Sequence, residues 1–159
     1  MSRLVGRLFE ASLDEKPTFE ALSYVWGDPQ SRKRIRCSGK NLSVTRSLAL
    51  ALNRIRNPTT SRIVWADAIC INQNDVEERN HQVRLMREIY TRAKRVLVSL
   101  DTGDGSNNES MTRLTGYQIP VADVLTESVR SALRAFFGSP WFTRIWCVQE
   151  IVLARKAVV

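Results

Sequence analysis

The sequence has few of the residues that build metal centres, disulfide frameworks or membrane anchors. Its three cysteines, Cys37, Cys70 and Cys147, stand far apart, without a paired zinc-ligand spacing or an even-numbered disulfide framework. The single histidine, His81, argues against a Cys-His catalytic dyad. No apolar run approaches the roughly 20 residues that cross a bilayer, and the N-terminus has no secretory signal pattern. These absences favour a cytoplasmic protein that binds no metal.

The composition is typical of one globular domain with a basic surface. With 159 residues, 43% of them hydrophobic, the chain is long enough to bury a core. The net charge of +8 is compatible with attraction to anionic small molecules such as dinucleotides. One dense basic cluster, Arg32-Lys33-Arg34 with Arg36, has no nucleic-acid-binding motif around it. We therefore expect a solvated basic surface rather than a nucleic-acid-binding protein.

The predicted elements alternate between strands and helices, which indicates a layered α/β fold with a mainly parallel central sheet flanked by helices. Core strands are expected over residues 20–26, 62–66 and 96–100, and an added β-hairpin is expected to turn at Ser38-Gly39-Lys40. Four helices are expected. The first is capped by Thr45 or Ser47, and the second follows a capping box at Asn74 and Glu77. The third covers 124–137, with Phe137 facing inward and Gly138 closing it, and the fourth runs from Ser139 through Ala154. Residues 157–159 begin another strand, so residues 1–159 are expected to be a single domain cut from a longer protein.

Two polar blocks directly follow predicted strands. In parallel sheets the loops at the carboxyl ends of strands converge on a ligand crevice. The first block offers Trp26, Gly27 and Asp28 together with Tyr24 of the strand, and an aromatic ring beside glycine can stack on a flat ligand. The alternative is that Tyr24 and Trp26 belong to the core and that residues 27–29 form only a turn.

The second block contains Asp67, Asn72 and Gln73. A buried aspartate needs hydrogen-bond partners, and Arg79 and Gln82 on the following helix are placed by sequence to supply them. A structural network that fixes the loop to the helix is therefore the first interpretation, and a ligand site is the second. Cys70, between two isoleucines, is interpreted as a core residue rather than a nucleophile, and so is Cys147.

Glu150 is the sharpest candidate for chemistry, because it lies in mid-helix beside Trp146 and Cys147 among apolar neighbours. Loss of hydration favours the neutral acid over the carboxylate, which suits catalytic carboxyl groups. The alternative is a structural ion pair with one of three arginines, Arg79, Arg144 or Arg155. The residues alone leave both interpretations open.

Three ordered motifs resemble the fungal heterokaryon incompatibility (HET) domain, and together they cover most of the chain. They are residues 21–29 (ALSYVWGDP), 65–75 (WADAICINQND) with 78–83 after them, and 144–150 (RIWCVQE). The chain departs from the family pattern at Leu100-Asp101, where Leu-Gly is usual, and in a shorter segment before the third motif.

The resemblance implies a TIR-like or flavodoxin-like fold, because HET domains are distantly similar to TIR domains. In NAD-cleaving TIR domains the glutamate of the Trp-Cys-x-x-Glu pattern is catalytic, and Glu150 stands at that position. The resemblance thus implies that NAD is a substrate rather than a bound cofactor. Tyr24, Trp26, Gly27, Asp28, Asp67, Asn72, Gln73, Arg79 and Trp146 are the binding residues that we expect around it.

Two functions from different classes follow from this resemblance. One is a cell-death effector of fungal non-self recognition that releases nicotinamide from NAD. The other is a non-catalytic module that triggers death by self-association or by recruiting other recognition proteins.

Overall fold

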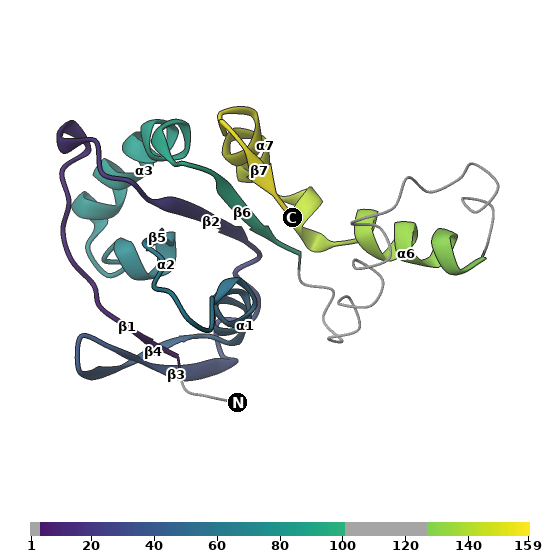
Figure 1. Cartoon of the computed structure of the whole chain (residues 1–159), viewed down its shortest axis with the longest axis horizontal. Coiled ribbons are helices and arrows are strands. Elements are labelled where there is room, and N and C mark those ends of the chain that lie inside the picture. Colours follow the sequence, from purple (N-terminus) through teal and green to yellow (C-terminus); the bar gives the residue numbers. More distant parts are fainter. Residues whose placement is uncertain (1–3, 101–126) are drawn as a thin grey trace. The chain divides into compact units, whose positions relative to one another are not determined.

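The computed structural model describes residues 4–100 and 127–159 (Figure 1). The chain forms two compact units, one made of Met1–Ser99 with Ile145–Val159 and the other of Leu100–Arg144. The first unit contains both sheets and carries all the candidate site residues. No helix in the described ranges combines the length and the apolar character needed to span a membrane.

The first unit is built on a four-stranded parallel sheet. Its strands are β2 (Glu20–Tyr24), β5 (Val64–Trp65), β6 (Val96–Ser99) and β7 (Ala157–Val158), in the spatial order β5-β2-β6-β7. Counted along the chain this order is 2-1-3-4, the order of flavodoxin-like doubly wound folds. The predicted α/β fold with a mainly parallel sheet is confirmed, although β5 is shorter than the strand expected over residues 62–66.

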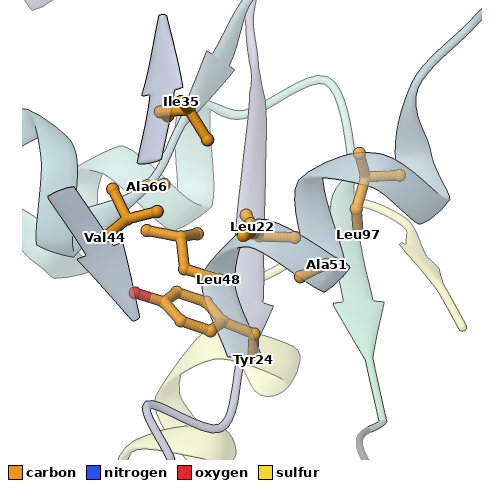
Figure 2. Close-up of a cluster of buried hydrophobic side chains, with 9 residues drawn as sticks. Leu22, Tyr24, Ile35, Val44, Leu48, Ala51, Ala66 and Leu97 are labelled. Atoms are coloured by element: carbon orange, nitrogen blue, oxygen red, sulfur yellow. The ribbon is translucent and has the colours of Figure 1, made fainter. Parts of the chain in front are cut away.

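The two faces of this sheet pack against different layers. Side chains alternate along a strand, so Leu22 and Tyr24 of β2 point to one face and Ser23 to the other. Leu22, Tyr24 and Leu97 of β6 belong to a buried cluster with α1 (Arg46–Ile55) and the hairpin (Figure 2). On the other face, α3 (Val76–Arg92) packs against α7 (Ile145–Val152). The sheet is therefore the middle layer of three.

A second, three-stranded sheet covers the α1 side. It consists of β1 (Val5–Gly6), parallel to β3 (Arg32–Cys37), and of β4 (Lys40–Thr45), antiparallel to β3; we call it the hairpin sheet. The turn residues Ser38 and Gly39 both have positive φ, 48° and 77°, as a two-residue turn between twisted strands requires. The predicted hairpin is confirmed, with a turn one residue shorter than expected.

The helix boundaries follow the caps that the sequence supplies. Thr45 caps α1 by accepting a bond from the Leu48 amide at 3.3 Å, one of the two expected caps. The capping box expected at Asn74 and Glu77 is wrong. Asp75 caps α3 instead, accepting the amides of residues 77 and 78 at 2.9 and 3.0 Å, because its short carboxylate reaches both free amides of the first turn. Short helices also form at η1 (Leu13–Glu15) and α2 (Asp67–Cys70).

The second unit contains α6 (Glu127–Phe137) and η2 (Pro140–Thr143). Gly138 ends α6 as predicted, since its amide donates to the Arg134 carbonyl at 2.8 Å and a β-carbon there would lie 2.7 Å from that oxygen. Phe137, expected to face inward, is 66% exposed. The predicted start of this helix, residues 124–126, lies outside the described residues, as does Asp101.

The single helix predicted from Ser139 through Ala154 is wrong, because the chain forms η2 and α7 as separate elements. Ser139 caps η2 through the Trp141 amide at 3.3 Å. Arg144 then adopts an extended conformation with φ −79° and ψ 128°, which breaks the helix. The predicted final strand is confirmed as β7, which pairs with β6.

Candidate functional site

Asp67 joins the ends of the two neighbouring strands β2 and β5. It accepts hydrogen bonds from the Tyr24 hydroxyl at 3.0 Å and from the Trp26 indole at 2.8 Å. The amide of Ala68 donates to the same carboxylate at 2.7 Å. Because β2 and β5 are parallel neighbours, their carboxyl ends bring these residues together. The two polar blocks thus converge.

The loop after Asp67 is tied back to it and to α3. Gln73 donates its side-chain amide to the Asp67 carbonyl at 3.0 Å, and Arg79 donates to the Gln73 carbonyl at 3.4 Å. Glu78 accepts the Asn72 amide at 2.9 Å. The network that fixes the loop to the helix therefore exists.

The partners expected for Asp67 are wrong. Tyr24 and Trp26, rather than Arg79 and Gln82, donate to its carboxylate. The reason is geometric: α2 begins at Asp67 and directs its side chain toward the end of β2, whereas the Arg79 guanidinium reaches only the backbone of residue 73.

The loop after β2 is a tight turn with an exposed aromatic ring. Ser47 of α1 donates its hydroxyl to the Val25 carbonyl. Gly27 has a φ of 70°, and a β-carbon there would lie 3.1 Å from that of Ser47, so this position favours glycine. Asp28 accepts the Gln30 amide at 2.8 Å and closes the turn. Trp26 is 43% exposed, whereas Tyr24 is 2% exposed and is packed in the core, the alternative that the sequence left open for it.

Glu150 lies on the opposite face of β2 from this cluster. It is 1% exposed, and its carboxylate accepts a hydrogen bond from the Ser23 hydroxyl, which is equally buried. Ser23 and Tyr24 are consecutive residues, so they project to opposite faces of the sheet. The structure therefore brings Tyr24, Trp26, Asp67, Gln73 and Arg79 into one network and holds Glu150 across the strand from it.

The remaining candidates lie at the surface. Trp146 lies in the first turn of α7 and is 45% exposed. Asn72 is exposed and accepts the Asn74 amide at 3.2 Å, a turn contact. His81 is exposed on α3.

Sequence reasoning missed Ser23 as the partner of Glu150. The sequence signal for this pair was a serine between Leu22 and Tyr24 in a buried strand, since a buried hydroxyl needs a hydrogen-bond partner. Glu150 and Ser23 are 127 residues apart, so no local pattern could pair them.

The two cysteines of the candidate motifs are packed rather than reactive. Burial raises the pKa of the Cys70 thiol, the charge of Asp67 acts in the same direction, and a hydrogen bond from the Ala66 amide opposes both. A thiol with a raised pKa is a poor nucleophile at neutral pH. Cys147 is buried. In the described part of the chain no three His, Cys, Asp or Glu residues cluster in a way that would hold a metal ion.

Comparisons with known proteins agree with the residue motifs. The family model for "Heterokaryon incompatibility protein (HET)" matches residues 19–150. The chain is 29% identical over 202 aligned residues to "Heterokaryon incompatibility protein 6, OR allele" of Neurospora crassa, an alignment that covers 95% of this chain and 30% of that relative. No solved structure matched the chain. The match to the family model spans well over half of the sequence, and the chain belongs to the heterokaryon incompatibility (HET) family.

Proposed function

We propose that this domain is a cell-death effector of fungal non-self recognition and that it acts by hydrolysing NAD. Its family membership and its similarity to heterokaryon incompatibility protein 6 support the biological role. The chain spans 30% of that relative's length, so the trigger and the recognition partner are expected to involve other proteins or other parts of a longer chain. The effector acts in the cytoplasm, where NAD is available.

The position of Glu150 carries the enzymatic part of the proposal. Its carboxylate is bonded to Ser23, the next-to-last residue of β2. Among the four strands of the parallel sheet, β2 and its neighbour β6 come first and third along the chain, so the strand order reverses between them. In doubly wound folds, nucleotides bind outside the carboxyl ends of strands at such a reversal. A buried glutamate at this place is therefore a candidate for nucleotide chemistry.

The proposed reaction is cleavage of the bond between the ribose C1′ and the nicotinamide nitrogen. The bonding pair leaves with nicotinamide, whose ring loses its positive charge, and C1′ becomes oxocarbenium-like. Glu150 stabilises that cation electrostatically, as carboxylates do in glycoside hydrolysis. Water then adds to C1′ and releases a proton, giving ADP-ribose. Ser23 acts as a positioning residue for the carboxylate, and the exposed Trp26 ring offers a surface on which a flat ring can stack.

Because Glu150 is buried, the proposed activity requires a structural change around it. A carboxylate that is 1% exposed does not reach a substrate unless its surroundings open. We therefore expect the monomer to be inactive and self-association to open the site. The enzymatic proposal therefore includes self-association as a step before turnover.

The test is nicotinamide release by the purified domain at high concentration, with wild type beside Glu150→Gln. The amide keeps the size of the side chain and can still accept from Ser23, so we expect a folded protein without turnover. Glu20→Gln is the matched control, because Glu20 is also a buried carboxylate of the first unit, 8% exposed, but at the other end of β2. It should lose stability and keep its activity per folded molecule. Turnover that persists in Glu150→Gln would remove the assigned role.

A second candidate function, a non-catalytic assembly module, is favoured by the surface of α7. Ile145, Val148 and Val152 are 82%, 62% and 73% exposed, and their spacing places them on one helical face. With Leu153 of the same segment and Arg87 of α3 they line a shallow groove. An apolar helix face of this kind suits contact with another copy of the chain.

Assembly is tested by the molar mass in solution as a function of concentration. We expect Val148→Asp to lower self-association, and Val83→Asp on α3, where the side chain is 37% exposed, to leave it unchanged. If oligomers form, no nicotinamide is released and cell killing survives Glu150→Ala, the assembly module replaces the enzyme as the proposed function.

A further inference from the structure

The positive charge of the chain is concentrated in one stretch. Residues 29–66 contain nine lysines and arginines and no aspartate or glutamate. The excess in this stretch, +9, is larger than the net charge of the whole chain, +8. Seven of the nine lie in β3, β4 and α1, the elements that cover one face of the parallel sheet.

Three arginines of β3 form a row on the outer face of the hairpin sheet. Ile35 and its partner Leu42 pack toward the core cluster. Alternation along the strand therefore turns Arg32, Arg34 and Arg36 outward. Their cross-strand partners on β4 are uncharged, namely Thr45, Ser43 and Asn41. We call the three arginines the basic face.

The basic face lacks local neutralisation. Arg32 is anchored by donating to Ser43, at 2.8 Å to its hydroxyl and 2.6 Å to its carbonyl. Arg34 and Arg36 are exposed, and the ion pairs found among the described residues include neither of them. The three arginines follow one another at every second position of β3, so their like charges repel one another. Binding of an anionic surface would relieve this repulsion.

Exposed apolar side chains adjoin the arginine row. Val5 of β1 pairs with Arg36 and is 72% exposed. Leu8 and Phe9 follow β1 and are 50% and 51% exposed, and the Leu8 amide donates to Ser38 in the hairpin turn at 3.0 Å. The apolar residues therefore lie at the end of the sheet where Arg36 lies.

We propose that the basic face docks on the surface of a bilayer that contains anionic phospholipid. Arginine binds phosphate groups through two parallel hydrogen bonds, and exposed aliphatic and aromatic side chains enter the boundary between headgroups and acyl chains. Bases of a nucleic acid would stack on aromatic rings, but two of the three apolar residues here are aliphatic. The combination of arginine with valine and leucine therefore favours lipid over nucleic acid.

The experiment is co-sedimentation of the chain with vesicles of phosphatidylcholine, with and without phosphatidylserine. We expect binding only to the vesicles that contain phosphatidylserine. Arg34→Gln/Arg36→Gln should weaken the partition coefficient about 30-fold, since each cation near an anionic leaflet contributes a gain of about fivefold. The control Arg84→Gln/Arg87→Gln removes the same charge from exposed positions on α3. We expect its partition coefficient to fall about threefold or less, because these charges lie away from the basic face and act on the bilayer only through screened, long-range attraction. Arg34→Lys/Arg36→Lys should keep most of the binding, and circular dichroism checks that each variant is folded.

A second variant pair tests the apolar part of the contact. Val5→Ser/Phe9→Ser should leave binding more sensitive to salt than in the wild type, because only the electrostatic part remains.

Three results would overturn the proposal. If Arg34→Gln/Arg36→Gln and Arg84→Gln/Arg87→Gln lose vesicle binding equally, the binding depends on the net charge of the chain and not on the basic face. Equal binding to vesicles without phosphatidylserine would remove the role of the arginines. Tighter binding to an oligouridylate than to the anionic vesicles, lost in Arg34→Gln/Arg36→Gln, would make the basic face a nucleic-acid site.

Discussion

The two ends of the parallel sheet hold their carboxylates in different ways. At the amino end, Glu20 of β2 accepts from two arginines, Arg62 at 3.0 Å and Arg95. Each arginine lies just before a strand that flanks β2, so the ion cluster joins three strands. At the carboxyl end, Asp67 accepts from a phenol, an indole and a backbone amide, and Glu150 accepts from a serine hydroxyl.

This difference distinguishes the structural ion cluster around Glu20 from the candidate site around Asp67 and Glu150. Two arginines pair with Glu20, so its negative charge is neutralised within the fold. The donors to Asp67 are neutral, and none of the ion pairs in the described ranges includes this residue. A cationic ligand such as the nicotinamide ring would therefore find negative charge at the carboxyl end and not at the amino end.

The largest effect on stability is expected at the amino end. Glu20→Ala leaves two arginines without their counter-ion, although each is still 26% to 32% exposed. We expect the free energy of unfolding to fall by about 2 to 3 kcal/mol, less than for fully buried pairs. The control is Glu88→Ala, which removes a surface pair with Arg92 on α3 and should cost about 0.5 kcal/mol or less. Chemical denaturation measures both, and equal losses would contradict the structural role of the Glu20 cluster.

A smaller loss is expected from the Asp67 network. Asp67→Ala leaves the buried Tyr24 hydroxyl and the Trp26 indole without their acceptor, which we expect to cost about 2 kcal/mol. Tyr24→Phe removes one donor and should cost about 1 kcal/mol. Tryptophan fluorescence during denaturation reports the change near Trp26. If Asp67→Ala is no less stable than Tyr24→Phe, the network does not hold the two strand ends together.

Ser23→Ala should lower stability by about 1 kcal/mol, because it removes a donor to the buried Glu150 carboxylate. Ser99→Ala is the matched control, since Ser99 is a buried serine on the neighbouring strand β6, and we expect a change within about 0.5 kcal/mol. A nicotinamide-release assay adds a second readout. If Ser23 positions Glu150, turnover falls in Ser23→Ala and not in Ser99→Ala.

The smallest expected effect is a change of folding stability with pH that comes from the Cys70 thiol. Burial raises the pKa of its thiol in the folded state, so the unfolded chain loses this proton at lower pH than the folded chain. The contribution to stability is complete below the ordinary thiol pKa of about 8.5 and declines as the pH rises above it. Between neutral and alkaline pH, wild type should therefore lose more stability than Cys70→Ala. A parallel decline of the two proteins would show that this thiol is not linked to folding.

Local patterns predicted the elements that depend on local chemistry. Hydrophobic runs located the strands β2 and β6, and Gly138 and Thr45 marked helix ends correctly. The break at Arg144 was missed because the run from Pro140 to Ala154 contains no residue that forbids a helix. The cap of α3 was assigned to Asn74 rather than Asp75, an error of one residue that periodicity cannot resolve.

Sequence patterns predicted that the loops of the candidate site converge, but not which of their side chains bond to one another. The parallel order of strands requires that residues after β2 and β5 meet, and they do. Which side chain bonds to which depends on the face of β2 that each residue occupies and on the direction of α2. Ser23 and Tyr24 lie on opposite faces of β2 because they are consecutive residues of one strand.

The central place of β2 also constrains how the domain folds. β2 is the first strand of the parallel sheet along the chain, but it pairs with strands that follow much later: Glu20 pairs with Val64, 44 residues away, and Ala21 pairs with Val96, 75 residues away. Such distant pairings make folding slow, because large loops must close before any contact is gained. During synthesis on the ribosome, this strand therefore has both edges unpaired until β5 and β6 emerge, and unpaired strand edges of this kind are prone to aggregation.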